Sequence, residues 1–141
     1  MRNYHLERFI EAQENMYDIA LNEIKSAGKY NHWMWFIFPQ IAGLGSSYYA
    51  QKYAVSSLDE ARAYIAHPIL GLRLLECTEA ILNLSTKDCP AFLGYIDSLK
   101  LCSCMTLFAN ATPEYTAFQK VIDKFYNGEH DKRTLALISF L

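Results

Sequence analysis

The sequence contains no long hydrophobic run. Its densest apolar stretch is the six residues from Trp33 to Phe38, whereas a helix needs about 18 apolar residues to cross a bilayer. Residues 1–8 also lack the apolar segment that forms the centre of a secretory signal. We therefore expect a protein with no membrane partner that resides in the cytoplasm.

Positive charge is also scarce. The 141 residues include 13 lysines and arginines against 15 aspartates and glutamates, which gives a net charge of −2. No run of basic residues supplies the positive field that draws a protein onto a nucleic-acid backbone. We predict no nucleic-acid partner.

Metal-ligand spacings and common catalytic motifs are missing. The four cysteines, which form no Cys-x-x-Cys pair, are Cys77, Cys89, Cys102 and Cys104. A zinc site would have to recruit His32 or His67 from distant parts of the chain, so we expect buried thiols and no metal. Neither Gly-x-Ser-x-Gly nor His-Glu-x-x-His occurs. We predict no cofactor.

What the chain does contain is helical periodicity. It is 52% hydrophobic and 14% aromatic, a composition typical of a globular domain, and the β-branched runs that indicate strands are few. We predict a mainly α-helical fold, a single compact domain over residues 1–141 with about seven helices. The expected helical segments, eight when the short stretch 48–53 is counted, are 4–27, 48–53, 58–66, 68–84, 90–95, 97–110, 113–126 and 132–140. One apolar face of the segment 68–84 is formed by Leu70, Leu74, Cys77, Ile81 and Leu84.

Several predicted helix ends carry capping residues. Ser57 and Glu60 have the spacing of a capping box, in which the serine accepts from the amide three residues on and the glutamate accepts from the serine's amide. Asp131 is placed to cap the last helix, and Asn3 the first. Gly28 is placed to end the first helix in the left-handed conformation.

The aromatic stretch from residue 32 to residue 53 is the expected site, because both tryptophans lie there. Large rings beside a few polar groups line small-molecule pockets, but they also fill ordinary cores. Trp33 fits core packing, whereas Trp35 lies two positions away and must face another side. Trp35, Gln40 and Tyr53 are the predicted ligand contacts of this stretch.

A glycine turn follows the aromatic residues. Its amides and hydroxyls are suited to a phosphate or carboxylate at a helix start, with Gly45 and Ser47 as the contacts. The alternative is a plain turn whose serine caps a helix through Tyr53. The spacing matches neither a P-loop nor a dinucleotide fingerprint.

Two histidines and an arginine are further candidates. His32 and His67 are possible acid–base groups because imidazole titrates near neutral pH, although His67, next to Pro68, can instead cap a helix junction. Arg73 lies on a leucine-rich helix, where a guanidinium must pair with a protein carboxylate or with a ligand phosphate.

A polar strip runs along the predicted helix 97–110. Asp97 and Lys100 are three residues apart and share a face, which Ser103 continues and to which Thr106 adds a second hydroxyl. The strip predicts one wall of a polar pocket. For Asp97 alone, the alternatives are a structural ion pair and a helix cap.

Five blocks of the chain are distinctive: HWMWFIFPQ (32–40), GLGSS (43–47), SLDEA (57–61), HPILGLRL (67–74) and DSLKLCSCMTLF (97–108). These blocks resemble a bacterial family known as domain of unknown function 1810, some members of which carry the label calpastatin. The resemblance covers nearly the whole chain. Cys104 departs from the family pattern, which has a serine there, and the family name implies no established activity.

A looser resemblance concerns YYAQK (48–52), which is similar to a helix of the NADAR (YbiA-like) family. Members of that family are small α-helical N-glycosidases that act on ADP-ribose-type or riboflavin-precursor substrates. Ser46 and Ser47 stand where that family has a glutamate and usually a histidine. The resemblance implies a YbiA-like fold and a nucleotide-like ligand.

Together these observations predict a small-molecule site in which Arg73 and the strip from Asp97 to Thr106 face the aromatic stretch. If the protein is an enzyme, the most concrete reaction is hydrolysis of a glycosidic bond. Asp97 would then stabilise an oxocarbenium-like centre, and His32 or His67 would move protons. Arg73 and Lys100 would hold anionic groups. The alternative is a non-catalytic interaction module whose aromatic stretch forms a homodimer or partner surface.

Overall fold

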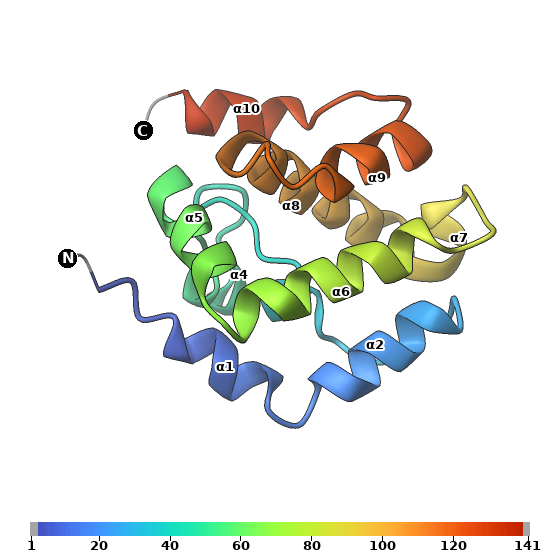
Figure 1. The fold of residues 1–141 in the computed structure, drawn as a ribbon, viewed down its shortest axis with the longest axis horizontal. Helices are drawn as coiled ribbons and strands as arrows, with labels where there is room; N and C mark the ends of the chain where they lie inside the picture. Colours follow the sequence, from blue (N-terminus) through green and yellow to red (C-terminus); the bar gives the residue numbers. More distant parts are fainter. Residues whose placement is uncertain (1–2, 140–141) are drawn as a thin grey trace.

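Helices make up all the regular structure of residues 3–139, the part of the chain that our computed structural model describes (Figure 1). They are α1 (Glu7–Gln13), α2 (Tyr17–Lys25), α3 (Met34–Ile37), α4 (Tyr48–Lys52), α5 (Leu58–Ala66), α6 (Leu70–Leu82), α7 (Cys89–Leu93), α8 (Tyr95–Ala111), α9 (Ala117–Phe125) and α10 (Lys132–Ile138). One isolated parallel β-bridge, Ile41 to Val55, joins the two loops that flank α4.

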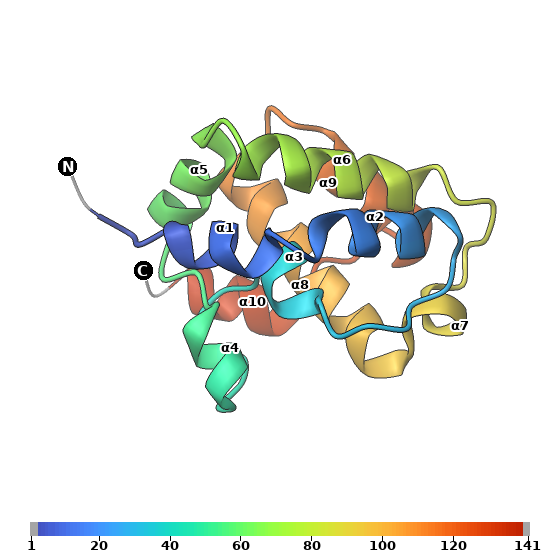
Figure 2. The same cartoon turned by 90° about the horizontal axis from the view of Figure 1, so that it is seen from below.

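The centre of the molecule is α8. Residues 101–108 are all buried, as expected of a helix that has apolar or small residues on every side. Around it pack α3, α5, α7, α9 and α10, and α6 lies beyond α9 and α5 with α2 on its far side (Figures 1 and 2). The two segments that form the site, residues 34–47 and α10, therefore both rest on this helix.

The predicted buried face of α6 is confirmed. Leu70, Leu74, Cys77 and Ile81 are all within 1% of full burial, at the spacing that brings one helix side against α2, α5 and α9. Leu84, the last residue of the predicted face, lies beyond the end of the helix.

The predicted number of helices was too low. The described residues form ten helices rather than about seven, because the segment predicted as 4–27 is two helices and α3 adds a single turn inside the aromatic stretch. The break lies at residues 14–16, between a helix that packs on α3 and one that packs on α6. Each half thus buries its own apolar side.

Three of the predicted caps are confirmed. Ser47, Ser57 and Asp131 each accept a hydrogen bond from the amide three residues on, at 3.2, 3.1 and 3.0 Å respectively. These bonds satisfy amides that have no partner inside the helix. The starts of α4, α5 and α10 are therefore set by local sequence.

Other predicted ends were wrong in detail. Asn3 accepts from the His5 amide and does not cap α1, which begins at Glu7. The left-handed residue after α2 is Ala27, with φ of 56°, and not Gly28. The Glu60 carboxylate reaches the amide and hydroxyl of Ser56 rather than the Ser57 amide.

The Glu60 carboxylate has a second partner that explains this shift. Its other oxygen pairs with the Arg8 guanidinium at 2.8 Å, and both side chains are largely buried. Arg8 also donates to the carbonyls of Lys52 and Ala54, at 2.7 and 2.8 Å. The clamp ties α1 to α5 and fixes the end of α4, which projects from the other helices (Figure 2).

Among the described residues, no helix has the length and apolar character that crossing a membrane requires.

Gly71→Ala should destabilise the fold strongly. Gly71 lies in the first turn of α6, where an added Cβ would lie 1.9 Å from the backbone carbonyl oxygen of Ile65. Because that oxygen belongs to the backbone of α5, we expect a loss of about 3 kcal/mol in the free energy of unfolding.

The matched control is Gly28→Ala, in which the added Cβ meets only the end of the Tyr30 ring at 3.1 Å. That ring is 85% exposed and can turn away. Urea unfolding of the two variants and the wild type measures the effect. Equal losses in both variants would contradict the proposed close contact between α5 and α6.

Candidate functional site

The two tryptophans have different environments. Trp33, which precedes α3, is fully buried and its indole N–H donates to Glu23 at 2.9 Å. Trp35, within α3, is only half-buried. The single turn of α3 ends at Phe38, whose backbone leaves the helical region ahead of Pro39. One indole is therefore part of the core and the other reaches a cavity.

Glu23 organises the loop that leads to these residues. Its carboxylate accepts hydrogen bonds from the amides of Tyr30 and Asn31, at 2.8 and 3.1 Å, as well as from the Asn31 side chain and Trp33. Burial raises the pKa of this carboxyl, but the four hydrogen bonds favour the charged form more strongly and bring the pKa to about 2.

A cavity of about 430 Å³ opens between α3, the loop after it, α8 and the start of α10. The lining side chains combine one large ring, apolar groups, a hydroxyl, an amide, a carboxylate and two cations. They are Trp35, Gln40, Leu44, Gly45, Ile96, Leu99, Lys100, Ser103, Asp131 and Arg133. These residues come from three segments that are distant in the sequence, 35–45, 96–103 and 131–133, and the fold brings the segments together.

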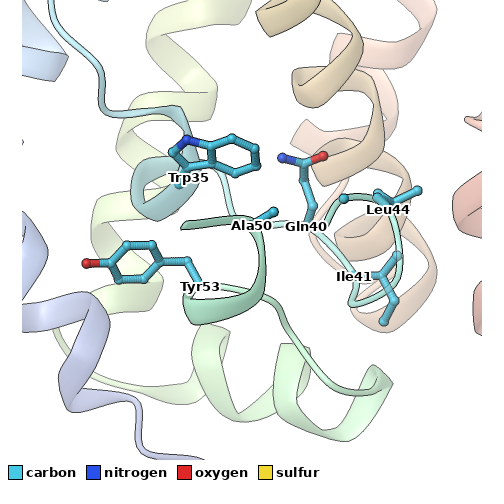
Figure 3. A pocket seen from close by; sticks show the side chains of 7 residues that line it. Trp35, Gln40, Ile41, Leu44, Ala50 and Tyr53 are labelled. Carbon is cyan, nitrogen blue, oxygen red and sulfur yellow. The ribbon is translucent and has the colours of Figure 1, made fainter. Parts of the chain in front are cut away.

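A smaller hollow joins this cavity, with which it shares Trp35, Gln40, Leu44 and Gly45 (Figure 3). Tyr53 lies on its other side. Figure 3 shows the Gln40 amide pointing toward the Trp35 indole. Within the described part of the chain this amide has no hydrogen-bond partner, so its donor and acceptor are open to a ligand.

Both tryptophan rings carry a lysine ammonium on one face. The Lys100 Nζ lies 3.7 Å from the Trp35 ring centroid, and the Lys29 Nζ lies 4.9 Å from that of Trp33. Both ammonium groups pair with Asp97, at 3.4 and 3.0 Å. Asp97 thus joins the loop 28–33 to α8, and the predicted ion pair with Lys100 is present.

The wall formed by α10 depends on Asp131. Its Oδ2 accepts from the Thr134 amide, the Thr134 hydroxyl and the Ser103 hydroxyl, the last at 3.2 Å. The Asp131 amide donates to the Thr106 hydroxyl at 2.8 Å. Two of the predicted polar residues of α8 therefore hold the start of α10 against it.

Arg133 closes the cavity on the side of the glycine turn. Its guanidinium donates to the Leu44 carbonyl at 2.9 Å. Beside this bond, Gly43 has a φ of 102°, and a Cβ there would lie 3.1 Å from the Leu137 side chain. A glycine is therefore required both by the backbone and by the approach of α10.

The structure brings together six of the predicted site residues. Five line the main cavity and Tyr53 lines the smaller hollow; the five are Trp35, Gln40, Gly45, Lys100 and Ser103. Three more lie close behind: Asp97 pairs with Lys100, Ser47 caps α4, and Thr106 is fully buried beneath Asp131.

The other three predicted residues lie outside the cavity. His32 is exposed on the loop, without a hydrogen bond to any described residue. The His67 Nδ1 accepts from the amides of Ile69 and Leu70 at the start of α6, which is the capping alternative. Arg73 lies over the Tyr17 ring and donates to Gln13, so its partners come from α1 and α2.

Sequence reasoning missed five lining residues. Ile96 lies four residues before Lys100, and Leu99 lies four residues before Ser103, so each shares a helix face with a residue of the predicted strip. The same spacing argument could have found both. Asp131 was read only as a cap. For Leu44 and Arg133 no sequence signal exists, because their meeting depends on how α10 folds back.

The cysteines take no part in the site. All four are buried free thiols, as predicted. Burial raises the pKa of Cys77 to about 12 and the pKa values of Cys89 and Cys102 to about 11, so these thiols stay protonated at neutral pH. Among the described residues, no three histidine, cysteine or acidic side chains are grouped in a way that could hold a metal.

The fold and site define a class: a small, mainly helical protein with a cavity walled by an indole, apolar groups, a carboxylate and two cations. Residues 3–138 match the family described as "Protein of unknown function (DUF1810)", and the chain belongs to that family. The predicted family resemblance is thereby confirmed.

One solved structure is closely similar: that of the "conserved hypothetical protein Rv1873" from Mycobacterium tuberculosis. It is 45% identical in sequence, and the match covers 96% of this chain and 97% of that one, with a TM-score of 0.94. No protein with a curated description matches the chain. The likeness to the NADAR family stays a prediction, since neither match concerns it.

Glu23→Gln should lower the free energy of unfolding at pH 7 by about 1.5–3 kcal/mol, since hydrogen bonds to a charged group are worth that much. The folded pKa of about 2 lies below the ordinary carboxyl value. The carboxylate therefore stabilises the fold fully above about pH 4.3, and this stabilisation is lost as the pH falls toward 2.

Urea unfolding at several pH values tests this. The difference between wild type and Glu23→Gln should shrink steadily from pH 5 to pH 2. Glu79→Gln, which makes the same change at an exposed site on α6, should cost little. A difference that is independent of pH would show that the Glu23 charge is not what holds the loop.

Proposed function

We propose that this protein binds a small organic ligand in the cavity between α3, the glycine turn, α8 and α10. The observation that carries the proposal is the half-buried Trp35 indole beside the Gln40 side-chain amide, which has no hydrogen-bond partner among residues 3–139, in a cavity of about 430 Å³. Small-molecule sites have volumes of this order and combine apolar walls with few convergent polar groups.

The lining matches a ligand that has one flat, apolar part. Leu44, Ile96 and Leu99 offer apolar surface next to the Trp35 ring, on which a planar ring can stack. Gln40 and Ser103 offer hydrogen bonds that would orient it. A nucleotide-derived compound is the ligand class that fits this combination and the looser family resemblance.

Binding has more support than glycosidic hydrolysis. A hydrolase needs a proton donor or acceptor at the ligand, and neither His32 nor His67 lines the cavity. Asp97 is held between two lysines, and the Asp131 carboxylate is engaged by Ser103 and Thr134. The groups that face the cavity hold a ligand better than they move protons.

The interaction-module alternative has less support at the aromatic stretch. Trp33, Met34, Ile37 and Phe38 are each at most 2% exposed in the single chain. They are covered by the protein's own helices, and so these four residues do not form the exposed apolar patch that marks an interface.

Ligand binding should raise the melting temperature. A panel of ADP-ribose, NAD and riboflavin precursors, each at about a hundred times its dissociation constant, should raise Tm by about 5–10 °C for any member that binds. Trp35→Ala should abolish the shift because it removes the stacking wall. Differential scanning fluorimetry and tryptophan fluorescence measure both effects.

The matched control is Tyr95→Ala, which truncates an exposed ring at the start of α8 that does not line the cavity. It should keep the full shift. A ligand shift that survives in Trp35→Ala, or one that Tyr95→Ala removes equally, would contradict the proposed location.

A further inference from the structure

We infer that the ligand of this cavity carries an oxyanion, a phosphate or a carboxylate group, which faces Lys100 and Arg133. The inference rests on the proposed binding function and adds the charge of the ligand to it.

The Asp97 carboxylate is shared by two lysines. It pairs with Lys29 at 3.0 Å and with Lys100 at 3.4 Å. One negative charge therefore serves two ammonium groups, and the triad keeps an excess positive charge. Of the two lysines, Lys100 is the one that lines the cavity.

The three side chains of this triad are largely buried. The side chains of Lys29, Asp97 and Lys100 are only 8%, 18% and 19% exposed. An excess charge held away from water is costly unless a counter-charge approaches it. The Trp35 ring face satisfies part of the Lys100 ammonium. A ligand anion in the cavity would supply the missing charge.

Arg133 contributes a second cation to the cavity from the facing wall. A guanidinium has five N–H donors, and the hydrogen bond to the neutral Leu44 carbonyl uses one of them. Arg133 forms no ion pair within residues 3–139. The remaining donors have the fork geometry that suits carboxylates and phosphates.

The cavity's own carboxylate, Asp131, pairs with neither cation of the lining. Asp131 Oδ2 accepts hydrogen bonds from the Ser103 hydroxyl and from the amide and hydroxyl of Thr134, and it forms no ion pair with Lys100 or Arg133. Lys29, Lys100 and Arg133 carry three positive charges, whereas Asp97 and Asp131 carry two negative charges. An oxyanion in the cavity faces a cation from α8 and another from α10.

The experiment uses matched ligand pairs that differ in charge: adenosine with adenosine monophosphate, and nicotinamide with nicotinate. Isothermal titration calorimetry at low salt should show that at least one charged member binds about tenfold more tightly than its neutral partner. The advantage should fall as salt is raised. Discrimination in the first pair identifies phosphate, and in the second pair carboxylate.

Two variants locate the effect. Lys100→Met keeps the apolar stem over Trp35 but removes the charge, and Arg133→Gln removes the second cation. Each should lose most of the preference for the charged member over the neutral one, when both affinities are measured on the same variant. A far-UV circular dichroism spectrum and a cooperative thermal transition like those of the wild type show that each variant is still folded.

Lys132→Met is the control, because it removes the same charge one residue from Arg133. Lys132 is exposed and faces a neighbouring hollow rather than this cavity. It should keep the preference. If Lys132→Met lowers the preference as much as Lys100→Met does, the effect is general surface charge and the inference is overturned.

Two further outcomes separate this inference from the proposed function. If charged and neutral members bind equally and Trp35→Ala weakens both, the cavity binds ligands but the anion inference is overturned. If charged members bind best but neither Trp35→Ala nor Lys100→Met changes their affinity, the anion binds elsewhere. That second outcome overturns both.

Discussion

The Glu23 carboxylate is the contact on which the site depends. Four hydrogen bonds from residues 30–33 converge on it, and they fix a loop that has no regular structure of its own. This loop places Trp33 in the core and brings Lys29 to Asp97. The loop thus connects α2 to α3 and to the cation triad on α8.

The two tryptophans have different environments because of this contact. The Trp33 N–H is bound to Glu23, so this indole faces the core. Trp35 lies two positions further along, within the single turn of α3, and therefore faces another side. That direction leads to the space beside α8 and α10. A largely buried lysine covers one face of each ring, and Asp97 pairs with both lysines and so joins the two segments.

Local patterns predicted what local physics decides. The bounds of α5, the caps at Ser47 and Asp131 and the buried face of α6 follow from spacing within one or two turns. Lys100 and Ser103, which share a helix face by their spacing, both line the cavity. Arg133 was not foreseen, because it meets Leu44 across 89 residues of sequence. The partners of Arg73 are likewise set by tertiary structure, which brings Gln13 of α1 and Tyr17 of α2 to α6.

The central claim is that Trp35 faces a ligand site while Trp33 is structural, and the two indole N–H signals of a ¹⁵N-labelled sample test it most directly. Trp35→Phe assigns them. On titration with adenosine monophosphate, the Trp35 signal should shift while the Trp33 signal stays in place and exchanges slowly with solvent. A Trp33 signal that moves while that of Trp35 does not would contradict the account.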